Sequence, residues 1–362
     1  MNSTMPSKFP GLPWWSLLLP PLACLPLLLG GDAHWFMLTT ALCLIAAVFI
    51  AVFHAEVVAH RIGEPLGTLV LALAVTLIEV SLIASIMTSG AEDVAMLARD
   101  TVFATVMIIC NGVVGLCLLV GAIRHRVIAF RVEGTASALS VLTALTALTL
   151  VLPEFTTSTA GPTYSPAQMI FAGTMSLLLY AVFLFVQTIR HREFFLPTVD
   201  EATEIHAPQP SGMTSLLSLV MLLITLIAVV GLTKQLSPSI QSLVSGAGAP
   251  PAVVGIIIAA LVLLPETVAA LRAALLNRMQ ISLNLALGSA LATIGLTIPC
   301  VVAIALWQDV SLILGLPSKE LVLLLITLVI STMTLAGGRA TVLQGAVHLV
   351  LFAAFLFLAI IP

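Results

Sequence analysis

Two glutamates interrupt long apolar stretches of the chain, and their type and position could do chemistry. Glu79 lies in "LAVTLIEVSLIAS" and Glu266 in "GIIIAALVLLPETVAAL", and each is the only ionisable residue in the middle of its stretch. A charge at the centre of a bilayer costs about 2.5–3.5 kcal/mol even on a lenient scale, so such residues mark ion or proton pathways. The alternative for either glutamate is a purely structural hydrogen bond.

The chemistry expected of two such carboxylates is competition between protons and a cation. Desolvation favours the neutral acid, so an empty site holds protons. An arriving cation favours the ionised form and displaces them, and oxygen ligands suit hard ions such as calcium. Competition at one site that opens to each side in turn is antiport. We therefore expect protons and calcium, with sodium or potassium as alternatives, to be transported, and we expect no cofactor.

Composition places these glutamates in a membrane. The chain has 362 residues, of which 60% are hydrophobic and 8% charged, whereas soluble domains carry about 25% charged residues. The net charge of -3 gives no sign of nucleic-acid binding. The five cysteines form no CxxC pair and are interpreted as packing residues. The sequence therefore predicts an integral membrane protein whose main partner is the lipid bilayer, and it does not determine the number of subunits.

Apolar runs predict an all-α fold with about eleven spans, because a helix needs about 20 apolar residues to cross a bilayer. The predicted spans are 13–30, 35–55, 66–88, 100–122, 135–153, 166–189, 214–233, 251–271, 283–307, 320–336 and 341–361. The run around Cys24 also resembles a cleavable signal sequence. We favour a retained helix within residues 1–34, because the apolar run continues past Cys24.

Basic residues predict the orientation. If the N-terminus is cytoplasmic, ten of the 13 lysines and arginines lie inside, and only Arg99, Lys234 and Lys319 lie outside. This bias follows the positive-inside rule. We expect a multi-pass protein of the cell inner membrane with an external C-terminus.

A polar, acidic segment at 190–213 divides the chain into halves of five spans each, 35–189 and 214–362. Because five is odd, the halves must insert with opposite orientations. That is the arrangement of an inverted-repeat transporter, whose substrate site lies near the midplane. Glu79 and Glu266 then occupy the second helix of each half. We interpret the acidic segment as a flexible cytoplasmic tether.

Neutral oxygen ligands are expected on the neighbouring helices. Thr76 lies one turn before Glu79 and shares its face. Asn111 lies in the third helix of the first half, and the equivalent helix of the second half carries Asn284, Ser289 and Thr293. Membrane serines and threonines also bond their own backbone or join helices, so both interpretations stay open.

A cluster of ionisable residues ends the second predicted span. The sequence "FHAEVVAHRIGEP" contains Glu56, His60 and Glu64. Histidine titrates near neutral pH, so this cluster could gate the site or relay protons. A solvated helix end is the alternative.

Two longer stretches resemble a known family. "HAEVVAHRIGEPLGTLVLALAVTLIEVSLI" resembles the first signature repeat of the cation/proton exchangers in the calcium/cation antiporter superfamily, and "VGIIIAALVLLPETVAALRAALLNRMQISLNLALGSALATIGLTIPCVV" resembles the second. The resemblance runs from about His54 to the C-terminus. It implies an N-terminal helix followed by two inverted five-helix repeats.

The resemblance also implies roles for individual residues. The family's essential carboxylates correspond to Glu79 and Glu266, and its acidic positions before the first repeat fall near Glu56 and Glu64. The family usually carries Gly-Asn before each essential glutamate, whereas "VTLIE" and "LLPE" stand here.

Two other functions compete with antiport. An intramembrane enzyme needs a nucleophile and a base, or metal-binding histidines, at membrane depth, and we note only His348 inside a predicted span. We therefore expect no enzyme. A passive cation channel would move cations without coupling them to protons.

Overall fold

The computed structural model describes residues 12–29, 34–62, 76–81, 83–84, 94–196, 210–308 and 310–361. Nearly all of these residues are helical. The α-helices are α1 (Trp14–Ala23), α2 (Leu25–Leu29), α3 (His34–Ile62), α5 (Val94–Met107), α6 (Val114–His125), α7 (Val132–Thr146), α8 (Leu152–Phe155), α9 (Pro166–Phe185), α10 (Gly212–Gly246), α11 (Ala252–Val262), α12 (Leu264–Leu275), α13 (Met279–Ala292), α14 (Ile298–Gln308), α15 (Ser318–Leu335) and α16 (Val342–Ile360).

The remaining elements are short. Four π-helical turns continue neighbouring α-helices, and one 3-10 turn follows α9. These are η1 (Ile108–Val113), η2 (Ala147–Val151), η3 (Val186–Arg190), η4 (Arg192–Phe194, the 3-10 turn) and η6 (Thr293–Thr297). Two strands, β1 (Ile128–Ala129) and β2 (Arg339–Ala340), pair antiparallel.

The predicted all-α membrane fold is confirmed. Eight described helices are long and apolar enough to cross a membrane, or nine if the bent pair α11–α12 is one span. The first predicted span appears as the shorter apolar stretch Trp14–Leu29. Of the predicted span 66–88, the structure describes 76–81 and 83–84, and both are helical. Large apolar side chains such as Leu343, which is 68% exposed, cover the surface as lipid contact requires.

The chain forms two compact units. The first comprises the described residues of Met1–Ser85 and Ile205–Leu243, and therefore contains α1, α2, α3 and most of α10. The ring of His54 on α3 lies 2.8 Å from the Ser16 carbonyl on α1. Arg61 at the end of α3 donates to the Pro210 carbonyl just before α10. These bonds hold the helices of the first unit together.

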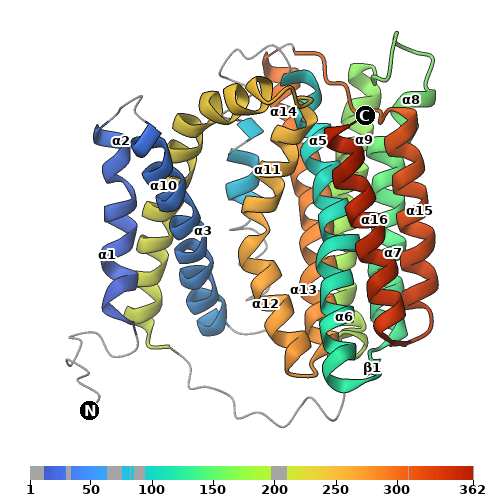
Figure 1. The fold of residues 1–362 in the computed structure, drawn as a ribbon, viewed down its shortest axis with the longest axis horizontal. Coiled ribbons are helices and arrows are strands. Elements are labelled where there is room, and N and C mark those ends of the chain that lie inside the picture. Colours follow the sequence, from blue (N-terminus) through green and yellow to red (C-terminus); the bar gives the residue numbers. More distant parts are fainter. Residues whose placement is uncertain are drawn as a thin grey trace. The chain divides into compact units, whose positions relative to one another are not determined.

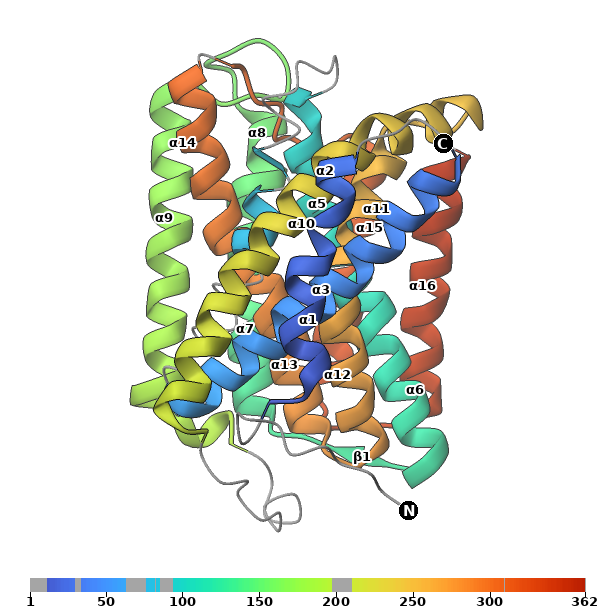
Figure 2. The same cartoon turned by 90° about the vertical axis from the view of Figure 1, so that its left-hand side faces the viewer.

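The second unit contains α5 to α9 and α11 to α16. In Figure 1, α16 runs beside α6 and α15, and the two helices contact it. Figure 2 shows α9 and α14 side by side, in agreement with their contacts. The strand pair β1–β2 joins the loop after α6 to the loop after α15, with Ile128 opposite Ala340. Both loops therefore lie on the same face of this unit.

The third helices of the two halves run antiparallel within the second unit. At one end, the ring of His125, the last residue of α6, lies 3.1 Å from the carbonyl of Leu275, which ends α12 just before α13. At the other end, the Ile313 N–H, after α14, donates to the Ala95 carbonyl at the start of α5. Equivalent helices of opposite direction are what an inverted repeat requires.

The span carrying Glu266 is broken. We expect one helix over 251–271, but α11 and α12 meet at Leu263 with a bend of 54°. Pro265 is the physical cause, because proline lacks the N–H of the helical ladder and its ring clashes with the carbonyl four residues earlier. Two other helices are longer than the predicted spans. α3 continues to Ile62 beyond the predicted span 35–55, and α10 continues to Gly246 beyond 214–233.

The start of the predicted tether is docked on the second unit. Phe195 is buried and packs edge-to-face on Phe183, with ring centroids 5.8 Å apart. His191 stacks on Phe194 and contacts the carboxylate of Glu193. The backbone N–H of Glu193 and then His191 lower the pKa of that carboxyl. The acidic residues Asp200, Glu201 and Glu204 lie outside the described residues, and a flexible tether there stays a prediction.

Candidate cation site

Glu266 begins the second half of the broken span. It lies in the first turn of α12, directly after Pro265, and is 8% exposed. The first N–H groups of a helix have no helical acceptor and carry partial positive charge, so this position favours a carboxylate. α12 packs against α6 and α13 and contacts η1. The break therefore gives a buried carboxylate a polar backbone environment, next to the helices that carry the predicted neutral ligands.

Glu79 lies in the helical segment 76–81 and is 3% exposed. Thr76, three residues earlier, is also buried, whereas Leu77 between them is 54% exposed. The expected common face of Thr76 and Glu79 is consistent with this pattern. Glu79 belongs to the first unit and Glu266 to the second, and their shared site stays a prediction.

Asn111 is fully buried in the π-helical turn η1. Its side-chain amide donates to Thr327 Oγ1 at 2.8 Å, and its Oδ1 lies 3.2 Å from His348 Nδ1. The other ring nitrogen of His348 lies 3.1 Å from Thr334 Oγ1. Asn111 thus joins the first half of the chain to α15 and α16 through a buried polar network.

Asn284 has a different set of partners. Its amide donates to the Phe195 carbonyl, and its Oδ1 accepts from Gln280 at 2.8 Å. Gln280 in turn accepts from the Arg131 backbone N–H at 2.7 Å. These bonds place Asn284 where the linker begins, near the end of the unit. A cation-ligand role for Asn284 stays a prediction that would require it to give up these bonds.

Ser289 and Thr293 lie four residues apart on one face of α13 and η6. Thr293 is buried and Ser289 is half-buried. Thr293 begins the π-helical turn η6, which occupies the same span of the second half as η1 does in the first. π-helical turns inside α-helices are frequent at functional sites. The third helix of each half, which carries predicted ligands, therefore contains a π-helical turn near its middle.

The cluster at the end of α3 is exposed. Glu56 and His60 lie in the last turns of this helix with exposed side chains, and Glu64 lies outside the described residues. His54, which the sequence places in the same cluster, instead lies inside the second predicted span and is fully buried against α1.

Three further polar residues at membrane depth join the site. Thr327, Thr334 and His348 are all buried; Thr327 and His348 bond to Asn111, and Thr334 bonds to His348. His348 was considered only as a lone histidine without a catalytic partner. Polar residues in otherwise apolar spans were the available signal, but the network that they form with Asn111 depends on the fold.

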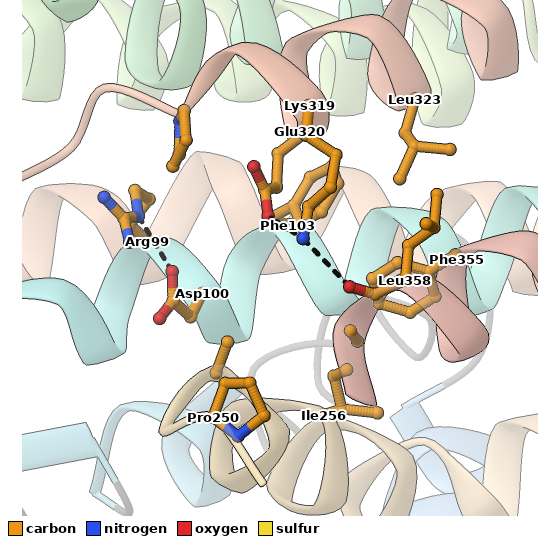
Figure 3. Close-up of a pocket in the computed structure, with 13 residues that line it drawn as sticks. Arg99, Asp100, Phe103, Pro250, Ile256, Lys319, Glu320, Leu323, Phe355 and Leu358 are labelled. Carbon is orange, nitrogen blue, oxygen red and sulfur yellow. Dashed lines mark hydrogen bonds and ion pairs between the residues drawn. The ribbon is translucent and has the colours of Figure 1, made fainter. Parts of the chain in front are cut away.

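A pocket of about 170 Å³ opens where α5 begins and α16 ends (Figure 3). Two neighbouring ion pairs line it: Arg99 with Asp100 at 2.8 Å, and Lys319 with Glu320 at 3.3 Å. Lys319 also donates to the Leu358 carbonyl at the end of α16, where a cation is favourable. Because each carboxylate has a cation beside it, we assign no cation site to this pocket.

An aromatic pair separates this pocket from the network around Asn111. Phe103 and Phe355 line the pocket (Figure 3) and pack edge-to-face, with centroids 5.6 Å apart. One turn further along the same face of α5 lies Met107, which is fully buried, and one turn beyond it lies Asn111. The network is therefore closed off from the pocket by apolar side chains.

Comparison with known proteins gives one family and similar chains. The family of sodium/calcium exchanger proteins matches residues 33–189 and 217–361. The protein y4hA of Sinorhizobium fredii is 45% identical over 368 residues and covers 100% of both chains. The sodium-potassium/proton antiporter ChaA of Escherichia coli strain K12 is 36% identical over 350 residues and covers 94% of each chain.

A solved structure shares the fold. The crystal structure of the H+/Ca2+ exchanger CAX superposes with a TM-score of 0.72 and 17% identity, covering 95% of this chain and 86% of the other. At this identity the likeness concerns the fold alone.

Proposed function

Because this chain belongs to the sodium/calcium exchanger protein family and is a multi-pass cation antiporter, we propose that it exchanges calcium for protons by alternating access. Sodium and potassium are the alternative cations, and potassium and sodium are the ions named for the similar protein ChaA. The observation that carries the proposal is Glu266, a buried carboxylate at the start of a half-helix in a broken span.

Glu79 and Glu266 form the shared site in this proposal. With protons bound, both groups are neutral, and with a divalent cation bound the site is again near neutral. Either state therefore avoids the cost of uncompensated charge at membrane depth. The empty, doubly ionised site is unfavourable, so the protein changes its access only when it is loaded with protons or with a cation. This requirement couples the two fluxes, and no covalent step is needed.

We propose that the neutral ligands of the cation are the hydroxyl groups of Thr76, Ser289 and Thr293, because hydroxyl oxygens suit hard cations. Thr76 is buried one turn from Glu79, and Ser289 and Thr293 lie on α13 and η6, in the helix next to Glu266. Asn111 and Asn284 are engaged by other side chains and backbone groups, so we assign them a supporting role.

We further propose that the protein lies in the inner membrane with its N-terminus in the cytoplasm. The support is the distribution of basic residues. Within the second unit, the face of the β1–β2 pair carries Arg126, Arg131 and Arg339 in its loops, and an excess of Lys and Arg marks cytoplasmic loops. On that assignment the sequence places Glu56, His60 and Glu64 at the cytoplasmic end of their helix, and we propose that they gate the site or relay protons.

The test is proton movement in inside-out vesicles on adding calcium, sodium or potassium separately. Glu79→Gln and Glu266→Gln keep the shape of the side chain but remove its titrating charge, so exchange should cease. The double variant should be no worse than either single one, because both groups serve one site. Thr76→Ala should only weaken cation affinity.

Glu133→Gln is the matched control, since Glu133 is exposed in the first turn of α7. It should exchange like wild type at equal expression. Near-normal exchange in either Glu79→Gln or Glu266→Gln would refute the shared site. Cation flux without proton movement in the wild type would identify a passive channel instead.

A further inference from the structure

The π-helical turn η1 leaves one backbone carbonyl outside the helical ladder. The Val114 N–H reaches back five residues to the Ile109 carbonyl, instead of the usual four. The four-residue pattern of α6 resumes beyond it, so the Cys110 carbonyl falls between the two patterns. A buried carbonyl in this position needs a partner from elsewhere in the fold.

The next π-helical turn along the chain, η2, shows how such a carbonyl is satisfied. There the Leu152 N–H reaches back to the Ala147 carbonyl, and Pro153 offers no N–H, so the Leu148 carbonyl is left out. The Tyr164 hydroxyl donates to this carbonyl at 2.8 Å. A side chain from another element thus completes the π-helical turn.

His348 lies at the corresponding place in η1. The histidine is fully buried on α16, and the Cys110 backbone lies next to its ring. Its Nδ1 lies 3.2 Å from Asn111 Oδ1. An Nδ1–H of a neutral ring donates to this oxygen, while Nε2 accepts from the Thr334 hydroxyl at 3.1 Å. One ring therefore holds the amide of η1 beside the carbonyl that the π-helical turn releases.

Two glycines bring the histidine close enough. A Cβ added at Gly115 on α6 would lie 2.8 Å from His348 Cβ, and one added at Gly345 on α16 would lie 2.5 Å from the Leu119 backbone nitrogen. Glycine at both positions lets the two helix backbones approach closely. The position of His348 against η1 is consequently fixed by backbone packing rather than by a flexible side chain.

We propose that His348 is a positioning residue of the cation site. It holds the π-helical turn η1 in shape, and η1 is in contact with α12, the helix whose first turn carries Glu266. Loss of the histidine releases the Asn111 amide, η1 relaxes, and the start of α12 moves. The inference rests on the proposed exchange function, since the site it positions is the cation site.

The test compares His348→Leu, which removes both nitrogens, with His348→Asn, whose amide nitrogen replaces Nδ1. Cation-driven proton movement in inside-out vesicles gives the half-saturating calcium concentration and the maximal rate. His348→Leu should raise the half-saturating concentration by at least about fivefold, as expected for a lost buried hydrogen bond. His348→Asn should stay within about twofold of wild type, with an unchanged pH profile. Thr334→Val is the control, because it removes only the partner of Nε2.

A second measurement does not depend on exchange. Cys110 is 1% exposed beside His348, so its reaction with N-ethylmaleimide, located by mass spectrometry, reports whether η1 stays closed. The thiol should react faster in His348→Leu and remain protected in His348→Asn and Thr334→Val.

Three results would overturn the proposal: wild-type affinity and Cys110 protection in His348→Leu, equal impairment in His348→Asn, or a shifted pH profile in His348→Asn, which would identify a proton carrier. Absence of exchange in the wild type would refute the proposed function, and the Cys110 labelling would still decide the role of His348 in η1.

Discussion

Replacing Gly345 with alanine should weaken the contact between α6 and α16 and, through it, the network around Asn111. The new Cβ would lie 2.5 Å from the Leu119 nitrogen, 2.7 Å from Leu119 Cα and 2.9 Å from the Gly115 carbonyl oxygen. All three atoms are backbone, so no side chain can rotate away. Ordinary contact begins at 3.4 Å, and the helices must separate by about 0.9 Å to restore it.

That separation has an energetic and a functional consequence. Overpacking of this kind lowers the free energy of unfolding by about 1–3 kcal/mol, and the backbone contacts place Gly345→Ala at the upper end. The bond between His348 and Asn111 is already 3.2 Å long, so the same movement takes it beyond hydrogen-bonding distance. We expect a lower melting temperature in detergent and a higher half-saturating calcium concentration in vesicles.

Gly288→Ala is the matched control. Gly288 lies in α13, another helix of the same unit, and no atom of the described residues lies within 4 Å of the Cβ that would be added there. Alanine inside a helix is favoured over glycine by about 0.5–1 kcal/mol, so this variant should melt no lower than wild type. Equal melting temperatures for Gly345→Ala and Gly288→Ala would refute the close contact of α6 with α16.

Two further predictions concern the loop before α9 and the topology. Tyr164→Phe removes the hydroxyl that donates to the Leu148 carbonyl and should lower the free energy of unfolding by about 1–2 kcal/mol. Burial raises the pKa of Tyr164, so the folded state keeps the phenol proton above about pH 10, where the unfolded state has lost it. Wild type should lose this stability as the pH rises beyond that value, and Tyr164→Phe should not; parallel melting curves for the two proteins across alkaline pH would contradict it. For the topology, a reporter fused after Pro362 should be active only outside the cytoplasm, and activity restricted to the cytoplasm would overturn the proposed orientation.

The helical membrane fold and its two acidic positions could be predicted from composition and burial costs. A long apolar run that crosses a bilayer must be helical, because its backbone groups have to bond within the segment. A carboxylate in the middle of such a run is costly, which indicates a function. We expected one helix over 251–271, although Pro265, whose missing N–H acts within one helix, was a local signal for the break near Glu266. The family resemblance also rested on contiguous residues and is confirmed by the family match.

The partners of the polar residues could not be predicted in this way. Asn111 bonds to His348, which lies 237 residues later, and Asn284 bonds to the Phe195 carbonyl, 89 residues earlier. Sequence pattern places each residue on a helix face but does not say which other helix comes within hydrogen-bonding distance of it. The two asparagines occupy equivalent helices in the sequence. Asn111 lies in a π-helical turn, whereas Asn284 bonds to the backbone at the start of the linker.

The sequence by itself determined what acts locally: the apolar runs that make helices, the proline that breaks one of them, and the carboxylates that membrane depth makes functional. Only the tertiary structure decided where the π-helical turns lie and what completes them. A carbonyl left out of a helical ladder is stable only if a donor from another element reaches it. Tyr164 donates to such a carbonyl because a returning loop brings it there, and close backbone packing holds His348 beside η1. Neither contact leaves a mark in the neighbouring sequence.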